Sequence, residues 1–233
     1  MAESQHVNLK TVAKVASSLG DINEEVVYVG GAVISLYVER SAAEEPRPTM
    51  DVDLSVQIST YAEMDALRER LAKKGIYPAS DQEVLYRFHL ESILIDFIPW
   101  ESSALGPTNS WLKPGFPLAI ENTISGQKIR ILPLSYFLAT KWEAYQSRGG
   151  DPRMSHDFED LIYLLFNSER VVPSFLQSPT EVKNYLQQMA HAILNHPYRN
   201  EILECHLPYK QALPGRTHII RVLEQILASG CGE

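Results

Sequence analysis

The chain has 233 residues, enough to bury a hydrophobic core in one large domain or two small ones. Hydrophobic residues make up 45% of it and charged residues 21%, which is typical of a soluble globular protein. The net charge of -8 argues against a broadly basic surface that binds nucleic acid. No apolar run is long enough to span a bilayer, and the N-terminus MAESQHVNLK lacks the basic start and apolar core of a signal peptide. We therefore expect a cytoplasmic protein with no membrane partner.

Strands and helices are mixed in the first part of the chain. Val12, Val15 and Leu19 share one face of a helix predicted over 7–19. The β-branched run over 26–29 predicts a strand that ends at Gly30-Gly31. The next predicted elements are a helix over 32–39, a Pro-containing loop over 41–49, a strand over 51–56 and a helix over 61–74. They are followed by a hairpin of 84–90 and 93–98 joined at Glu91-Ser92, a long loop over 101–117, and a hairpin of 118–122 and 127–132 across Ser125-Gly126.

Beyond Leu134 the sequence predicts helices alone. Their apolar positions recur at helical spacing over 134–147, 155–166, 181–194 and 217–228. Mixed strands and helices that are followed by helices alone indicate an α+β fold with a helical C-terminal domain. We therefore predict one domain over 1–132 and a second, helical domain over 133–233.

Two carboxylates share one face of the strand predicted over 51–56. Successive residues of a strand point to opposite faces, so Asp51 and Asp53 lie together, opposite the apolar Val52 and Leu54. A third acid, Asp96, follows an apolar stretch in the later hairpin, where an unpartnered carboxylate is costly. A divalent ion relieves the repulsion between such acids and can serve both the attacking and the leaving oxygen of a transfer reaction. An Asp-x-Asp pattern is short, and by itself it also fits a pair of solvated carboxylates.

The Gly30-Gly31 pair lies upstream of these acids, between a predicted strand and a predicted helix. Glycines at such a place let backbone amides approach a phosphate closely, and a helix N-terminus adds its positive end. A Gly-Gly pair by itself is equally typical of an ordinary tight turn. In combination with the three acids it indicates the geometry of phosphoryl transfer.

A second group of polar residues lies in the predicted helical domain. Lys141 is the one charge in the apolar stripe of the helix over 134–147, so its ammonium either snorkels to water or meets an anion such as phosphate. Ser155 is a suitable N-cap for the next helix. The helix dipole favours acids in the first turn, which gives Asp157 and Asp160 a purely structural explanation.

Two tryptophans, Trp100 and Trp111, flank the loop around residues 101–110, where they either stack on a base or anchor the loop to the core. The sequence contains no Walker A loop, no Gly-x-Ser-x-Gly elbow and no paired Cys-x-x-Cys motif. Their absence argues against a P-loop, esterase or zinc-binding protein.

These residues carry a family resemblance. The stretch from Tyr28-Val29-Gly30-Gly31 to Thr49-Met50-Asp51-Val52-Asp53, followed by Asp96, resembles the polymerase-beta-like nucleotidyltransferase superfamily. That superfamily often has Gly-Ser where this chain has Gly-Gly, so the grip on phosphate would depend on backbone amides.

Within the superfamily, the chain resembles the AbiEii/AbiGii-type group of nucleotidyltransferase toxins. Arg47-Pro48-Thr49 is similar to the Arg-x-Thr/Ser lead-in of that group. Its second motif is a lysine followed by an Asp-x-x-Asp-Leu helix. The residues that resemble this motif are Lys141, Arg148, Asp157 and Asp160.

The resemblance implies a nucleotidyltransferase-like mixed sheet with flanking helices, and a helical domain that completes the active-site cleft. A nucleoside triphosphate, ATP included, would bind with Mg2+ or Mn2+, and its monophosphate would pass to a hydroxyl of a tRNA or a protein, with an antitoxin as a further partner. The alternatives are transfer to a small molecule of the antibiotic type, and a module that binds a nucleotide or a partner without catalysis. The implied metal ligands are Asp51, Asp53 and Asp96. The implied nucleotide-binding residues are Gly30, Gly31, Arg47, Thr49, Lys141 and Arg148. Asp157 or Asp160 would orient Lys141 or the acceptor.

Overall fold

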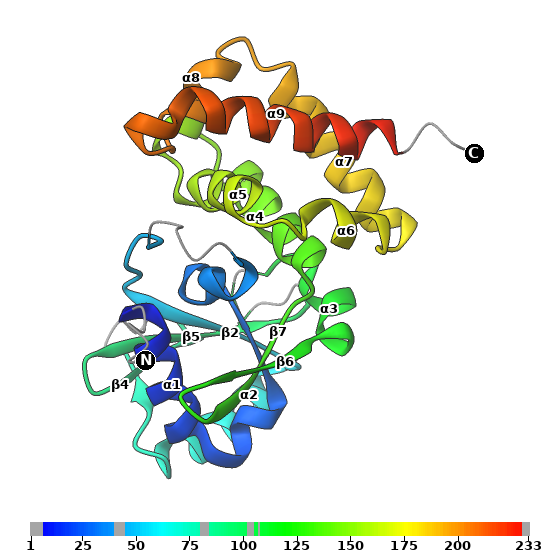
Figure 1. The fold of residues 1–233 in the computed structure, drawn as a ribbon. Coiled ribbons are helices and arrows are strands. Elements are labelled where there is room, and N and C mark those ends of the chain that lie inside the picture. Colours follow the sequence, from blue (N-terminus) through cyan, green and yellow to red (C-terminus); the bar gives the residue numbers. More distant parts are fainter. Residues whose placement is uncertain (1–6, 40–44, 80–83, 102–104, 107, 230–233) are drawn as a thin grey trace. The chain divides into compact units, whose positions relative to one another are not determined.

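The computed structural model describes residues 7–39, 45–79, 84–101, 105–106 and 108–229. The loops expected over 41–49 and 101–117 therefore lie partly outside the described residues. The chain divides into two compact units (Figure 1). The sheet unit comprises the described residues of Met1–Ser35 and Arg47–Pro133, and the helical unit those of Leu36–Pro46 and Leu134–Glu233.

A mixed seven-stranded sheet, with strand order β3-β4-β5-β2-β1-β7-β6, forms the centre of the sheet unit. The strand β1 (Val26–Val29) is antiparallel to β2 (Asp51–Val56) and parallel to β7 (Gln127–Ile131), and β2 is parallel to β5 (Ile93–Pro99). All four residues of β1 are buried, as its unbroken apolar run predicts. The edge strands are β3 (Tyr77–Pro78) and β6 (Ile120–Ile124), and β4 (Arg87–Leu90) lies between β3 and β5.

Helices flank this sheet. The helix α1 (Val7–Leu19) buries its predicted apolar face and contacts β6 and β7. At α2 (Tyr61–Ala72) a capping box closes the N-terminus, because the Thr60 hydroxyl accepts from the Glu63 amide and the Glu63 carboxylate accepts from the Thr60 amide. The shorter helical elements are η1 (Gly20–Glu25), η2 (Gly31–Tyr37), α3 (Leu112–Gly115) and η3 (Phe116–Leu118).

Several predicted elements of this unit need correction. The helix expected over 32–39 is the 3-10 helix η2, a difference that agrees with the low α-helix propensity of its β-branched Val33 and Ile34. The last hairpin turns at Ser125-Gly126 as expected, but its first strand spans Ile120–Ile124 instead of 118–122, because the two turn residues adopt positive φ angles and pair Ile124 directly with Gln127. The strand expected from residue 84 begins at Arg87, and α3 and η3 occupy part of the expected long loop.

The helical unit contains the four helices that the sequence predicts. They are α4 (Leu134–Arg148), α5 (His156–Asn167), α7 (Thr180–Leu194) and α9 (Ala212–Ala228). The expected N-cap is confirmed, since Ser155 Oγ accepts from the Phe158 amide at 3.3 Å. The sequence patterns miss α6 (Val171–Leu176) and α8 (Arg199–Glu204), which are too short to display a period, and the 3-10 turns η4 (Pro152–Met154) and η5 (Tyr209–Gln211).

The long helix α9 packs against four other helices of this unit, α5, α6, α7 and α8. The described residues of Leu36–Pro46, 36–39 and 45–46, belong to the same unit, although they precede most of the sheet in sequence. The ring of Tyr37 lies 4.6 Å from that of Phe137 on α4, and Arg170 forms an ion pair with Glu39. Within the described residues, no helix is both long enough and apolar enough to cross a membrane.

Gly30 terminates β1 in a conformation that a side chain would disrupt. Its φ is +69°, and a Cβ built there would lie 1.8 Å from Oδ2 and 2.7 Å from Cγ of Asp53. The clash arises because Val29 and Asp53 are register partners on β1 and β2. The turn therefore requires glycine for two separate reasons, a positive φ and the position of a neighbouring carboxylate.

We expect Gly30→Ala to destabilise the protein more than Gly126→Ala does. Gly126 also has a positive φ, +79°, but open space surrounds its Cβ position, so it isolates the cost of φ, which is about 1–2 kcal/mol. The clash with Asp53 should add about 1–3 kcal/mol to that cost in Gly30→Ala. Urea denaturation of both variants measures the difference. Equal losses would show that Asp53 moves aside freely.

Candidate functional site

Strand register assembles a row of functional side chains across the sheet. Asp53 on β2 pairs with Asp96 on β5, and Asp96 pairs in turn with Arg87 on β4. Register partners on neighbouring strands present their side chains on the same face of a sheet. Asp51 lies two residues before Asp53 and so shares this face. Residues that are far apart in sequence thus meet at one place.

The three acids predicted as metal ligands converge in this row. One carboxylate oxygen of each of Asp51, Asp53 and Asp96 lies within 4.8 Å of the other two. Asp96 is only 5% exposed, whereas Asp51 and Asp53 are half-buried. Among the described residues, this is the one group of three or more Asp, Glu, His or Cys side chains with such spacing. An all-oxygen donor set of this kind fits a divalent cation such as Mg2+ or Mn2+.

Arg87 completes the row and neutralises part of its charge. Its Nε donates to Asp96 Oδ1 at 2.8 Å and its Nη2 to Asp96 Oδ2 at 2.7 Å, in a two-pronged pair. The same Nη2 lies 3.9 Å from Oδ2 of Asp51. The hydrogen bonds to Asp96 raise the pKa of Arg87 above its already high ordinary value, so this guanidinium carries its full charge.

The sequence patterns did not single out Arg87, although a signal was present. The hairpin was expected to turn at Glu91-Ser92, and a two-residue turn pairs Leu90 with Ile93. Counting back along both strands from that pair places Arg87 opposite Asp96. The strand register of the hairpin, rather than a local sequence motif, thus identifies Arg87 as the partner of Asp96.

A buried asparagine holds the segment that leads into β2. Asn8 of α1 donates from Nδ2 to the carbonyl of Arg47 and accepts at Oδ1 from the amide of Thr49, both at 3.1 Å. Its side chain is thus satisfied at both ends while only 5% exposed. This clamp fixes the backbone two residues before Asp51. The phosphate-binding roles of Arg47 and Thr49, both half-buried, stay predictions.

In the helical unit, Lys141 is buried among charges of opposite sign. It is 6% exposed, and its Nζ lies 2.6 Å from Asp160 Oδ2 and 3.4 Å from Asp157 Oδ1. Arg148 forms an ion pair with the other oxygen of Asp157. The snorkelling alternative is therefore wrong, because the ammonium ends on two carboxylates of α5 instead of in water.

The Lys141 cluster, composed of Lys141, Arg148, Asp157 and Asp160, balances two cations against two carboxylates. Buried charges are tolerated only when they are paired, and loss of one partner leaves an uncompensated charge. A role in stabilising the fold is therefore sufficient to explain why these four charges lie together. Its predicted roles in holding a triphosphate and in orienting the acceptor stay predictions.

The anchoring alternative agrees with the contacts of Trp100. Its ring meets that of Phe116 edge-on at 5.3 Å, and the ammonium of Lys113 lies 5.9 Å from it. An indole with these contacts anchors its backbone segment to the neighbouring residues.

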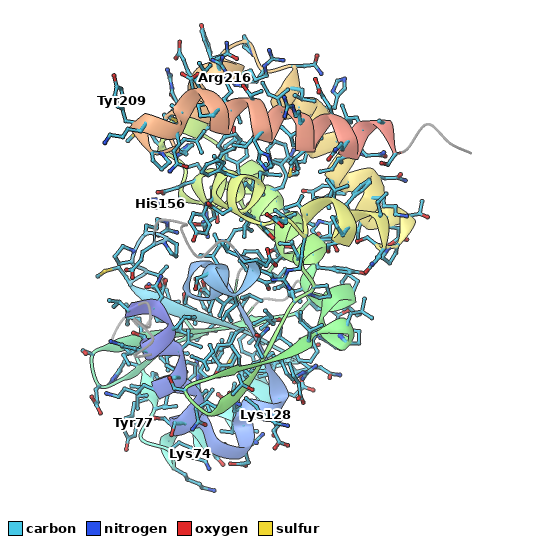
Figure 2. All side chains as sticks on the ribbon, viewed as in Figure 1. Lys74, Tyr77, Lys128, His156, Tyr209 and Arg216 are labelled. Carbon is cyan, nitrogen blue, oxygen red and sulfur yellow. The ribbon has the colours of Figure 1, made fainter. Side chains whose placement is uncertain are left out.

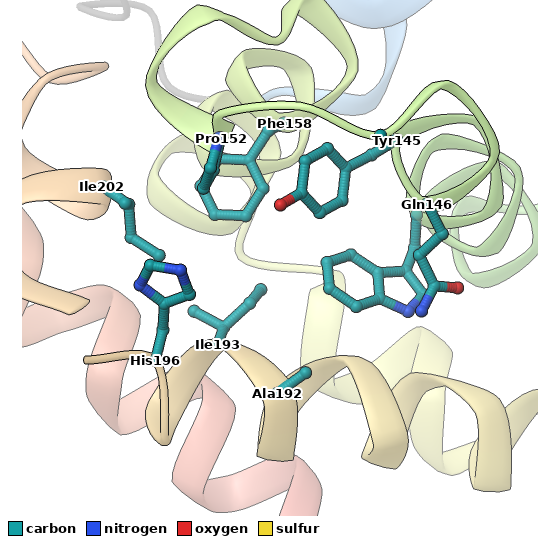
Figure 3. Close-up of a pocket in the computed structure, with 10 residues that line it drawn as sticks. Tyr145, Gln146, Pro152, Phe158, Ala192, Ile193, His196 and Ile202 are labelled. Atoms are coloured by element: carbon teal, nitrogen blue, oxygen red, sulfur yellow. The ribbon is translucent and has the colours of Figure 1, made fainter. Parts of the chain in front are cut away.

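The helical unit also contains a pocket of about 400 Å³, between α4, α5, α7 and the turn at η4 (Figure 3). Its wall is largely aromatic and apolar, and the ring of Tyr145 lies 5.2 Å from those of Trp142 and Phe158. The residues around the cavity include Trp142, Tyr145, Phe158, Ile193, His196 and Ile202. None of the site residues predicted from the sequence lines it, so it is separate from the Lys141 cluster.

Comparisons with known proteins show the fold. No model of a protein family matches the chain, and no curated protein sequence matches it. An antigenic nucleotidyltransferase-like protein from Paracoccidioides brasiliensis has a similar structure, with a TM-score of 0.50 and 19% identity, over 85% of this chain and 93% of that one.

Two further solved structures are similar at lower scores. The antibiotic-resistance factor ANT(2'')-Ia gives a TM-score of 0.46 at 14% identity, over 80% of this chain and 96% of its own. JHP933 from Helicobacter pylori gives a TM-score of 0.46 at 11% identity, over 97% of this chain and 94% of its own. From the Paracoccidioides protein and the mixed sheet, we conclude that this chain has the predicted α+β, nucleotidyltransferase-like fold with a helical C-terminal region.

Proposed function

We propose that this chain is a divalent-metal-dependent nucleotidyltransferase that moves a nucleoside monophosphate from a nucleoside triphosphate to an acceptor hydroxyl. The observation that carries the proposal is the convergence of Asp51, Asp53 and Asp96 on one face of a sheet with a nucleotidyltransferase-like fold. Phosphoryl-group transfer depends on positioning and charge stabilisation more than on covalent chemistry, and a cluster of acidic ligands serves both.

Each part of the sheet unit has a defined task in this proposal. Asp51, Asp53 and Asp96 hold the ion, which when bound supplies Lewis-acid stabilisation of the reacting phosphate oxygens. Because Gly30 has no side chain, the Asp53 carboxylate has room beside it. The backbone amides of Gly30 and Gly31 hold the phosphates. Since η2 is a 3-10 helix of seven residues, this grip depends on the amides themselves more than on a long helix dipole.

We further propose which class of molecule accepts the nucleotide. The resemblance to AbiEii/AbiGii-type toxins supports transfer to a tRNA or a protein, with an antitoxin as partner. The net charge of -8 favours a protein over an RNA acceptor, because a polyanion meets repulsion at such a surface. Transfer to a small molecule of the antibiotic type is the second candidate, since it needs no polyanion-binding surface.

A labelling experiment tests the function and the acceptor together. Purified protein is incubated with each α-labelled nucleoside triphosphate, Mg2+, and either total RNA, total protein or a panel of antibiotics that carry hydroxyl groups. Label should appear covalently in one acceptor class with the wild-type chain and be absent with Asp53→Asn. If no triphosphate labels any acceptor, the catalytic proposal fails and the non-catalytic binding module replaces it.

We expect Asp53→Asn to abolish binding of Mn2+ while leaving the fold intact or slightly more stable, because the repulsion between neighbouring carboxylates is relieved. A triphosphate with Mg2+ should raise Tm in the wild type but not in this variant, since the ligand binds the native state only. Calorimetric titration and thermal denaturation measure the two effects. Asp65→Asn, an exposed change on α2, is the matched control. Undiminished Mn2+ binding in Asp53→Asn would contradict the metal centre.

Loss of the Lys141 ammonium should destabilise the helical unit. We expect Lys141→Met to cost about 3–5 kcal/mol, because it keeps most of the side-chain volume but leaves Asp157 and Asp160 uncompensated. Addition of Asp160→Asn should recover part of the loss. Lys128→Met is the control, since Lys128 lies at the surface with a side chain 76% exposed (Figure 2). Urea denaturation that detects no difference between the two lysines would contradict the structural role of this cluster.

The proposed phosphate contact of Lys141 needs a separate measurement, activity per folded molecule. Lys141→Arg keeps the charge but replaces a compact ammonium with a planar fork. If Lys141 holds the triphosphate, turnover should fall by about two orders of magnitude or more in the folded variant. Full activity in folded Lys141→Arg and in folded Lys141→Met would limit Lys141 to the structural role.

A further inference from the structure

The guanidinium of Arg87 contacts two of the three proposed metal ligands. It uses both oxygens of Asp96, at 2.8 and 2.7 Å, and its Nη2 lies 3.9 Å from Asp51 Oδ2. A cation that approaches Asp51 and Asp96 together meets a positive charge already in place. Like charges that share the same carboxylates repel each other, and partial burial of the site weakens the screening of that repulsion.

The two partners differ in their freedom to move. The side chain of Asp96 is 7% exposed, whereas that of Arg87 is 31% exposed. An unpaired carboxylate at the buried position would be costly, but a long guanidinium side chain at its position can turn towards solvent. An exchange of partners at Asp96 therefore involves movement of Arg87 rather than of Asp96.

We infer that Arg87 is an exchangeable counter-ion, which neutralises Asp96 while no divalent ion is bound and competes with that ion for the carboxylate. The inference rests on the proposed metal centre and adds a control on its occupancy. The three carboxylates and the Arg87 guanidinium have a formal charge of -2, so they still attract a divalent ion, but less strongly than the same three acids would without Arg87. Metal uptake is thereby made weak and reversible.

A positioning role for Arg87 predicts the opposite result. A hydrogen-bonded partner that only orients a ligating carboxylate increases its affinity for metal, and its removal typically lowers that affinity about 10–100-fold. A competitor that is removed raises the affinity. The sign of the change therefore separates the two roles without any measurement of activity.

The experiment is a Mn2+ titration of the full chain, followed by calorimetry or by the loss of the free-ion electron paramagnetic resonance signal. Arg87→Gln should bind Mn2+ at least about tenfold more tightly than the wild type, the reverse of the loss expected for an orienting partner. Arg87→Lys, which keeps the charge but loses the two-pronged geometry, should be intermediate. Arg130→Gln is the control, since Arg130 also lies on a strand of the sheet but donates to the carbonyls of Glu24 and Phe116.

Thermal denaturation supplies a second readout. Without metal, Arg87→Gln should melt at a lower temperature than the wild type, because Asp96 loses its partner, and Mn2+ should raise its Tm by more than it raises that of the wild type. Should Arg87→Gln fail to fold even with Mn2+, the affinity of Arg87→Lys decides: an affinity above the wild-type value supports competition, and an equal or lower one overturns it.

The outcomes separate this inference from the proposed function. Suppose that the wild type binds Mn2+ and Asp53→Asn does not. Equal or weaker Mn2+ binding by Arg87→Gln then overturns the competition alone. If neither the wild type nor Arg87→Gln binds Mn2+, the competition and the metal centre are both contradicted. Tighter binding in Arg87→Gln with an unchanged Arg130→Gln supports both.

Discussion

The register of four neighbouring strands is the constraint on which the candidate site depends. Because β1, β2, β5 and β4 pair without slippage, the end of β1, the acid pair of β2, Asp96 and Arg87 fall into one row. A shift by one residue at any of these pairings would send the side chains of one strand to the opposite face. The absence of a side chain at Gly30 belongs to the same constraint, since the row leaves no volume there for a Cβ.

Local sequence patterns were sufficient for elements whose period is strong. The bounds of α1, β1 and β2 follow directly from helical spacing and from β-branched runs, and alternation along β2 places Asp51 and Asp53 on one face. These are properties of one segment at a time. They do not depend on which segment packs against which.

Features that depend on partners could not be predicted in this way. The clamp from Asn8 joins residues that lie about 40 positions apart, and an asparagine near the start of a helix has no local pattern that indicates such a contact. Lys141 shows the converse difficulty, because its position in an apolar stripe fits both a snorkelling side chain and a buried one. Only the placement of α5 against α4, with Asp157 and Asp160 facing Lys141, decides between them. Segments such as α6 and α8 lack the length to display a period.

The two buried charge systems neutralise their carboxylates by different physical means. On the sheet, a partly exposed guanidinium pairs with a buried acid, so in the proposed exchange Arg87 turns towards water while Asp96 stays in place. In the helical unit, the ammonium is itself buried against Asp160, and neither partner can leave without exposing an unpaired charge to an apolar surrounding. The first arrangement suits exchange of ligands, and the second suits permanent structure.

The parallel pairing of β1 with β7 has a consequence for the order of folding. Tyr28 is the register partner of Ile131, and the side chain of Asn23 donates to the carbonyl of Lys128, contacts that close loops of more than 100 residues. During synthesis, β1 emerges long before the strand that covers one of its edges, and until then that edge offers unpaired amides and carbonyls to any other chain. Such non-local pairings form slowly, because the entropy of loop closure is lost before the contacts are gained. A ribosome-bound chain that ends before Gln127 therefore exposes an apolar strand edge, the kind of surface that chaperones bind.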